Sequence, residues 1–301
     1  MPIINEAPTL LLGGSGFLGS YFTKSLPPGS IINISPRDEN PALDGMIKKF
    51  GRFDSKGSVL EFLQSLDFKN VINCIALANI EECERNPGLA KWLNVELPAL
   101  VAGHCKSIGA SMIHISTDAV FDGSIPQRSE SDTPVPVSTY GKSKLEGENR
   151  ILQTLPQSLI ARVNFFGHSR RKESLFNYFY STIKSGKEVL AYDDVFFTPT
   201  YALDTVRLIL ELEGKSCTGV FHVVGDERIS KYDFARKISN IFDLDSRYIT
   251  RVEAPKNKMD TLRGHDLSLD NRKLKSLGVL PCSIENGLLS LKLEMEKINA
   301  S

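Results

Sequence analysis

The sequence predicts an α/β protein in which helices cover both faces of a parallel sheet, with a smaller α/β lobe attached. Three observations favour this doubly wound class. Short apolar runs alternate with longer amphipathic segments, the first run leads into a glycine-rich turn, and 301 residues exceed the usual size of one domain. Continuous Val, Ile and Leu runs are typical of strands that meet water on neither face.

The elements follow in order along the chain. The predicted strands, all short and apolar, are residues 9–12, 30–34, 70–75, 111–116, 159–163 and 220–224. The predicted helices, all longer and amphipathic, are residues 17–25, 59–66, 89–108, 138–155, 174–185, 202–212 and 231–242. The regular alternation loosens after Phe165. We therefore expect a dinucleotide-binding domain of residues 1–163 plus about 196–224, and a substrate-binding lobe of about 164–195 plus 225–301.

Composition excludes several classes of protein. Thirty-six basic residues balance thirty-six acidic ones, so no overall charge attracts nucleic acid or a membrane surface. The five cysteines are widely spaced and lack metal-site spacing, which favours reduced thiols and no bound metal. The sequence has no apolar stretch of the ~18 to 20 residues that a membrane span needs, and no signal-peptide pattern. These features predict a cytoplasmic protein.

The first predicted strand runs into a glycine-rich segment at residues 13–19. Read in two registers, it matches G-x-G-x-x-G and G-x-x-G-x-x-G. Glycine lets the chain turn sharply and brings backbone N–H groups close to a pyrophosphate, whose charge the following helix N-terminus favours. This strand, turn and helix predict a Rossmann dinucleotide site formed by Gly13, Ser15, Gly16, Phe17, Leu18 and Gly19.

The end of the second predicted strand favours NADP(H) over NAD(H). An NAD site usually carries Asp or Glu at this position, whereas an NADP site carries a cation. Here the strand is followed by Ser35 and Arg37, which can hold a 2′-phosphate. An ordinary solvated charge at Arg37 is the alternative.

Proton-transfer chemistry is predicted by three residues in the second quarter of the chain. Thr117 follows the strand at 111–116, and Tyr140 and Lys144 are spaced i, i+4, so they lie on one face of a helix that Ser138 can cap. A reductase of a carbonyl needs a proton donor, and a tyrosine beside an ammonium can serve. Tyr180 and Lys184 have the same spacing, but no glycine loop and Ser/Thr-tipped strand precede them, so we expect ordinary packing there.

Several motifs resemble those of the extended short-chain dehydrogenase/reductases, most closely the branch of dTDP-4-dehydrorhamnose reductase and its sugar-nucleotide relatives. The matching segments are residues 13–19, 73–76, 94–96, 114–123, 140–148, 162–167, 199–201 and 267–274. The resemblance implies that Tyr140 donates a proton, Lys144 binds the nicotinamide ribose and tunes Tyr140, and Thr117 orients a sugar keto oxygen.

The same resemblance implies further contacts. Asp54 matches a position at the adenine end of the cofactor, and Asn73 and Ala76 line the cofactor cleft. The substrate, a nucleotide-sugar, is expected to meet Thr117, Asp118, Asn164 and Phe165, with the second lobe holding it. Some relatives form oligomers, so a homodimer is possible in this family.

Three departures from the family pattern keep alternatives open. Ala119 stands where the family usually has tyrosine, and Phe197 stands where it has glycine. Asn164 and Phe165 stand where relatives often have tryptophan. The favoured interpretation is an NADPH-dependent reductase of a nucleotide-activated 4-keto-6-deoxy sugar in polysaccharide biosynthesis. The alternatives are an epimerase or dehydratase of the same superfamily, and a non-catalytic NADP-binding subunit like the β subunit of methionine adenosyltransferase.

Two further patterns are interpreted as structural. His114 alternates within a buried strand, which favours a hydrogen-bonded core histidine over a catalytic one. Glu81, Glu82 and Glu84 form an acidic run, which is most often a solvated face.

Overall fold

A computed structural model describes residues 8–27, 29–34, 47–50, 53–169, 174–255 and 264–300, and side chains at 31–34, 47–50 and 299–300 lie outside that description. The chain divides into two compact units. Unit 1 comprises Met1–Val120, Ser138–Arg162 and Ile209–Phe221, and unit 2 comprises Phe121–Val137, Val163–Leu208 and His222–Ser301. Each unit is described by itself.

The sheet of unit 1 has seven strands in the order β11-β6-β5-β4-β1-β2-β3. The strands are β1 (Thr9–Leu12), β2 (Ile31–Ile34), β3 (Ile47–Phe50), β4 (Asn70–Asn73), β5 (Ser111–Thr117), β6 (Leu159–Val163) and β11 (Gly219–Val223). Parallel ladders join β3, β2, β1, β4 and β5 in succession. The strand order reverses between β1 and β4, which is where Rossmann folds bind their ligands.

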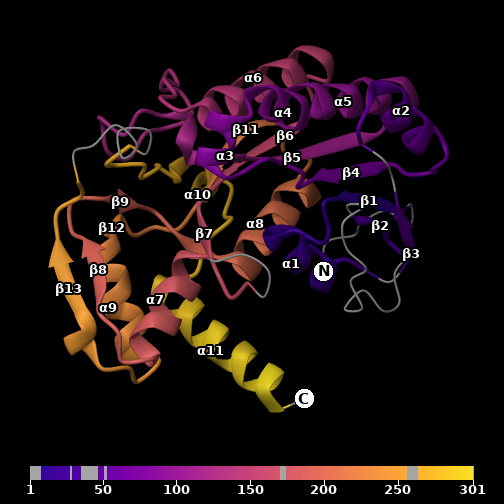
Figure 1. Ribbon diagram of the computed structural model, residues 1–301. Coiled ribbons are helices and arrows are strands. Elements are labelled where there is room, and N and C mark those ends of the chain that lie inside the picture. The colour runs from indigo at the N-terminus through magenta and orange to yellow at the C-terminus, as the bar shows by residue number, and fades with distance from the viewer. Residues whose placement is uncertain are drawn as a thin grey trace. The chain divides into compact units, whose positions relative to one another are not determined.

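The helices of unit 1 bury the sheet. They are α1 (Phe17–Ser25), α2 (Lys56–Gln64), α3 (Ile80–Arg85), α4 (Pro87–Lys91), the π-helical η1 (Trp92–Glu96), α5 (Leu97–Ile108), the 3-10 helix η2 (Asp118–Val120) and α6 (Thr139–Thr154). Figure 1 shows α2, α5 and α6 over one face of the sheet and α1 on the other. Leu10, Leu63, Val101 and Ile151 belong to one buried cluster of the first face, so these helices share a core with β1.

The predicted helix at 89–108 is three successive pieces, α4, η1 and α5. Pro98 lies at the start of α5 and has no backbone N–H to donate to the Asn94 carbonyl, which disfavours regular α-helical bonding at this point. The wider π-helical turn accommodates the interruption. Trp92 begins this turn, and its indole N–H donates to the Phe53 carbonyl at 2.6 Å.

Unit 2 consists of short elements. They are β7 (Phe165–Phe166), α7 (Leu175–Lys184), β8 (Val189–Tyr192), β9 (Phe196–Phe197), β10 (Thr200–Tyr201), α8 (Ala202–Gly214, whose end belongs to unit 1), β12 (Ile229–Ser230), α9 (Lys231–Ile241), the 3-10 helix η3 (Ser246–Tyr248), β13 (Ile249–Val252), α10 (Arg272–Ser276) and α11 (Ile284–Ala300). The strands form the two-stranded pairs β10-β7, β12-β9 and β13-β8.

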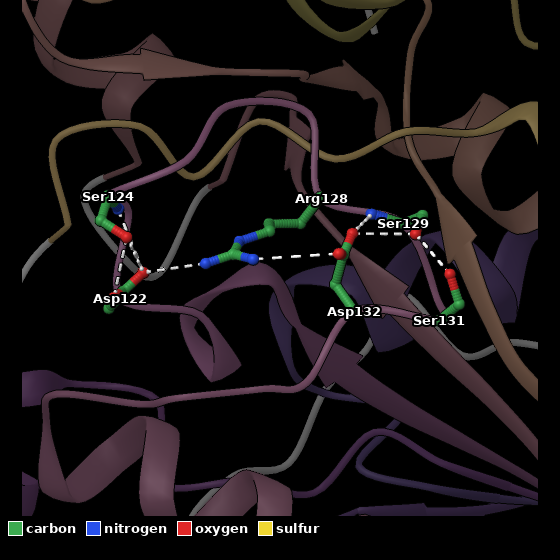
Figure 2. A network of polar contacts seen from close by, with 6 residues as sticks. All are labelled: Asp122, Ser124, Arg128, Ser129, Ser131 and Asp132. Carbon is green, nitrogen blue, oxygen red and sulfur yellow. Dashed lines mark hydrogen bonds and ion pairs between the residues drawn. The ribbon is translucent and has the colours of Figure 1, made fainter.

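Residues 121–137 belong to unit 2, although the sequence places them in the dinucleotide-binding domain. Backbone hydrogen bonds explain the difference, because the Arg128 N–H donates to Ser268 and the Arg128 carbonyl accepts from Asp270. Gly123 also packs closely on Gly264, because a Cβ built on Gly123 would lie 2.6 Å from the Cα of Gly264. Figure 2 shows the Arg128 guanidinium between Asp122 and Asp132, at 3.7 and 3.8 Å.

Residues 196–208 also belong to unit 2, against the predicted boundary. The Phe196 N–H donates to His265 at 2.7 Å, and the Phe196 carbonyl accepts from Leu267 at 3.1 Å. The Tyr201 hydroxyl donates to Glu294 of α11 at 2.6 Å. These partners lie 69 or more positions further along the chain, so local sequence patterns do not indicate them.

Candidate active site

The glycine loop between β1 and α1 leaves little room for a side chain at Gly13 or Gly19. Gly13 has φ +84°, and a Cβ on Gly19 would lie 2.0 Å from the Gly13 carbonyl oxygen. Gly16 is the N-cap of α1 and has no side chain to accept hydrogen bonds from the first turn, so an anionic group can take that place. Ser15 and Phe17 are partly exposed there, whereas Leu18 is buried. This geometry fits the pyrophosphate of a dinucleotide.

The other predicted cofactor residues have varied positions. Asp54 is exposed before α2 and accepts a hydrogen bond from the Ser58 hydroxyl at 2.8 Å. Ala76 is partly exposed in the segment after β4. Asn73 is fully buried, so its side chain faces the interior. Ser35 and Arg37 lie outside the described residues.

The carboxyl end of β5 carries Thr117 and Asp118, and both are buried. The Thr117 hydroxyl donates to the Asp118 carboxylate at 3.0 Å and accepts from the Ala119 N–H at 3.2 Å. The Thr117 side chain also acts on the pKa of Tyr140, which it lowers. Thr117 and Tyr140 therefore lie in one neighbourhood of unit 1, and their joint role in catalysis stays a prediction.

The helix α6 begins just before Tyr140 and is capped twice. The Ser138 side chain accepts from the Gly141 N–H at 3.1 Å, which confirms the predicted cap. In addition, the two carboxylate oxygens of Glu84 accept from the Thr139 N–H and hydroxyl at 2.6 and 2.8 Å. The interpretation of Glu84 as part of a solvated face is wrong, because its carboxylate is committed to α6. These contacts fix the turn that carries Tyr140.

Lys144 lies one turn further along α6 and is buried. Its Nζ donates to the Ile115 carbonyl at 2.6 Å and lies 2.9 Å from His114 Nε2. His114 has no exposed surface, and its Nδ1 lies 3.0 Å from the Asn73 amide nitrogen. The interpretation of His114 as a hydrogen-bonded core histidine is confirmed, but sequence reasoning missed its contact with Lys144.

Burial has the largest effect on the pKa values of Tyr140 and Lys144. It raises the pKa of Tyr140 above its ordinary value, and the charge of Asp118 adds to that effect, while the Thr117 side chain opposes it. Burial lowers the pKa of Lys144 to about 8, against the opposing charge of Glu148. The lowering of the Tyr140 pKa by Lys144 stays a prediction, because burial has the largest effect on this phenol. The neutral phenol is a hydrogen-bond and proton donor.

Two networks of buried hydrogen bonds join α6 to β6 and to η1, and sequence reasoning missed both. The Glu148 carboxylate accepts from Arg162 on β6 and from the Ser116 hydroxyl, next to Thr117. The Asn94 side chain donates to the Ser143 hydroxyl at 2.9 Å. A Cβ on Gly147 would lie 2.1 Å from the Asn94 carbonyl oxygen, so α6 and η1 are in backbone contact.

Asn164 and Phe165 belong to unit 2, and both are partly exposed. The Asn164 carbonyl accepts from the Thr200 N–H at 3.0 Å, and Phe165 pairs with Thr200 in the ladder of β7 and β10. Phe197, the departure from the family pattern, is buried against Phe234. It serves as a core residue of unit 2.

Two properties of the described residues bear on other functions. No cluster of three or more His, Cys, Asp or Glu side chains there has an arrangement that could hold a metal ion. Among the helices in that part of the chain, none combines the length and apolar character of a membrane span.

The strand order and the glycine loop define this molecule as a Rossmann-type α/β protein. The model of the RmlD substrate binding domain family matches residues 8–292. The chain belongs to that family.

Two relatives are each 32% identical to the chain over the residues that align. A probable low-salt glycan biosynthesis reductase, Agl14 of Haloferax volcanii, is 32% identical over 243 residues, which cover 79% of this chain and 81% of the relative. Methionine adenosyltransferase 2 subunit beta of Danio rerio is 32% identical over 226 residues, which cover 72% and 69%. The named relatives therefore include both a reductase and a subunit of another enzyme.

Solved structures show the same fold. A hypothetical dTDP-4-dehydrorhamnose reductase from Sulfolobus tokodaii is 30% identical with a TM-score of 0.79, covering 93% of this chain and 98% of its own. A dTDP-4-dehydrorhamnose reductase from Bacillus anthracis in complex with NADP is 22% identical with a TM-score of 0.82, covering 96% and 99%. A Streptomyces venezuelae dTDP-glucose 4,6-dehydratase with NAD bound is 21% identical with a TM-score of 0.78, covering 94% and 95%.

Proposed function

We propose that this protein is an NADPH-dependent reductase of a nucleotide-activated 4-keto-6-deoxy sugar used in glycan biosynthesis. The observation that carries the proposal is that Tyr140 and Lys144 lie one turn apart on α6, with the buried Thr117 close enough to act on the Tyr140 pKa, in the unit that holds the glycine loop. Membership of the family and the similarity to the Haloferax reductase support this class of substrate.

The residues of unit 1 divide the work. The loop from Gly13 to Gly19 and the start of α1 would hold the pyrophosphate, and Lys144 would hold the ribose next to the nicotinamide. When bound, NADPH supplies a hydride to the carbonyl carbon. Tyr140 is protonated at neutral pH, because burial raises its pKa, and it gives its proton to the sugar oxygen. Thr117 orients that oxygen by hydrogen bonding.

The preference for NADPH over NADH is part of the proposal and rests on Ser35 and Arg37. Arg37→Ala should weaken binding of NADPH selectively, because NADH has no 2′-phosphate for a cation to contact. Fluorescence titration of both cofactors measures the two affinities. An equal loss for both, or a preference of the unaltered protein for NADH, would contradict this assignment.

Tyr140→Phe tests the proton donor. The variant should bind NADPH normally but turn over about 10² to 10⁴ times more slowly, the usual effect of losing a positioned acid. Tyr180→Phe is the matched control, since the Tyr180 hydroxyl has its own lysine partner, Lys184, at 3.0 Å in unit 2. Single-turnover oxidation of NADPH with a panel of 4-keto nucleotide-sugars measures both. A Tyr140→Phe variant with full activity would refute the mechanism.

A second candidate is a non-catalytic NADP-binding subunit. The similarity to methionine adenosyltransferase 2 subunit beta and the replacement of the usual tyrosine by Ala119 favour it. In the same assay, a wild-type protein that binds NADPH but reduces no member of a broad panel would support this candidate. Net NADPH oxidation would exclude it and would also exclude an epimerase, which returns its cofactor to the starting state.

A further inference from the structure

Three buried side chains of unit 1 form a chain of polar contacts that ends at Lys144. Asn73 at the end of β4, His114 on β5 and Lys144 on α6 are at most 1% exposed. The Asn73 amide nitrogen lies 3.0 Å from His114 Nδ1, and His114 Nε2 lies 2.9 Å from Lys144 Nζ. At the other end, the Ile75 backbone N–H donates to Asn73 Oδ1 at 3.1 Å.

The backbone end of this chain fixes the direction of every hydrogen bond. A backbone N–H can only donate, so the Asn73 oxygen must face Ile75 and the amide NH₂ must face His114. His114 Nδ1 then accepts, and in a neutral imidazole the proton is therefore on Nε2. That N–H faces Lys144 Nζ. An ammonium has no lone pair to accept it, whereas a neutral amine has one.

The opposite protonation state leaves a conflict. If Lys144 is an ammonium, His114 Nε2 must accept, so Nδ1 carries the proton and the Asn73 oxygen must turn toward it. The Asn73 NH₂ group then faces the Ile75 N–H, donor against donor. An unpaired buried donor costs free energy, so this arrangement is the less favourable one.

We propose that Asn73 and His114 are positioning residues that favour the neutral amine of Lys144, and that uptake of a proton at Nζ requires His114 to change tautomer and the Asn73 amide to turn over. This role differs from the predicted one, in which Asn73 lines the cofactor cleft. It deepens the proposed reductase function and rests on it only for its consequence in catalysis.

Burial also favours the neutral amine of Lys144, whereas the charge of Glu148 favours the ammonium. On α6, Tyr140 is a neutral phenol, and Glu148 is committed to Arg162 and Ser116. After β4, burial raises the pKa of the Cys74 thiol to about 12, so it stays neutral. Burial and the charge of Lys144 hold the pKa of His114 well below its usual value, which keeps its ring in one of two neutral tautomers.

The consequence for the reaction concerns the return of Tyr140 to its starting state. When Tyr140 has given its proton to the sugar oxygen, a phenolate remains and must be reprotonated. A protonated Lys144 can release its Nζ proton toward that phenolate and become the amine that Asn73 and His114 favour. The buried chain thus makes Lys144 a better proton donor.

Nitrogen NMR of the whole protein tests the proposal without measuring activity. In protein labelled with ¹⁵N histidine and ¹⁵N lysine, His114 should carry its proton on Nε2 above pH 9, and its tautomer should change as the Lys144 amine titrates. A proton that stays on Nδ1 throughout would overturn the proposal, whether or not the protein proves to be a reductase.

Asn73→Asp provides the matched perturbation. A carboxylate accepts from both the Ile75 N–H and His114 Nδ1–H, so Nε2 accepts from an ammonium and the conflict disappears. The Lys144 pKa should rise by about 1 to 3 units, and His114 should carry its proton on Nδ1. Asn70→Asp, at the start of the same strand and bonded to Ser111, is the control and should change neither. An unchanged tautomer in folded Asn73→Asp would refute the proposal, and if that variant does not fold, the wild-type tautomer decides.

Discussion

Replacing Arg162 with methionine should destabilise unit 1 strongly, because the buried carboxylate of Glu148 would lose its counter-charge. The side chains of Arg162 and Glu148 are 4% and 2% exposed. Arg162 Nε lies 3.0 and 3.2 Å from the two carboxylate oxygens, and Nη2 lies 2.7 Å from one of them. In Arg162→Met, Glu148 would keep only the Ser116 hydroxyl among these partners.

The magnitude follows from the burial of the pair. Removing one partner of a buried ion pair costs about 3 to 5 kcal/mol, because the remaining charge has neither water nor a counter-charge. The pair Arg150 and Glu146 on the outer face of α6 provides the comparison, since these side chains are 44% and 47% exposed. An exposed helix pair contributes only ~0.3 to 0.5 kcal/mol. The two losses should therefore differ by about 3 kcal/mol or more.

Urea unfolding of the two variants measures this difference. Arg162→Met should lower the free energy of unfolding by the larger amount, and Arg150→Met should stay within about 0.5 kcal/mol of the wild type. Glu148→Gln with Arg162→Met, which removes both charges, should recover part of the loss. A loss below 1 kcal/mol in Arg162→Met alone would refute the argument that this pair pins α6 to the sheet.

Two further predictions concern the glycine loop and Lys144. Gly19→Ala should abolish cofactor binding or folding, because its Cβ would lie 2.0 Å from the Gly13 carbonyl oxygen. Gly88→Ala is the control and should be tolerated, because nothing lies within 4 Å of a Cβ at that position. Cofactor titration and thermal melts of the two variants measure binding and folding separately. The pKa of Lys144 is 10.5 in the unfolded chain and about 8 in the folded protein, so the unfolded state binds more protons at pH values between the two. The free energy of unfolding should therefore rise with pH across that range by about 3 kcal/mol. This rise should vanish in Lys144→Met, and its persistence there would assign it to another group.

Local sequence patterns predict the elements with strong periodicity. The strands at 9–12 and 159–163 and the helix at 17–25 have the predicted bounds, because apolar runs and the glycine loop define both of their ends. The helix α11 and the short strands of unit 2 carry no such pattern. Their partners are distant in the chain, as with Tyr201 and Glu294, and propensity does not report a partner of that kind.

The site divides in the same way. Tyr140, Lys144 and Thr117 could be predicted because helical spacing and a strand end place them in known positions. The contacts of Glu84 with Thr139 and of Arg162 with Glu148 could not, because the sequence patterns around Glu84 and Glu148 are those of ordinary surface charges and do not indicate distant partners. A charged residue inside an otherwise apolar run, as at Arg162, is the one available signal for a buried ion pair.

The division of the chain between its two units has a consequence for biosynthesis. The chain passes from one unit to the other after residues 120, 137, 162, 208 and 221. During translation, the sheet of unit 1 cannot be completed until β11 has left the ribosome. Residues 121–137 cannot form their hydrogen bonds until residues 264–270 have been synthesised. A nascent chain stalled before residue 219 therefore exposes the open edge of β6, a surface that chaperones would have to protect. For the same reason, neither unit can be obtained by cutting the gene once.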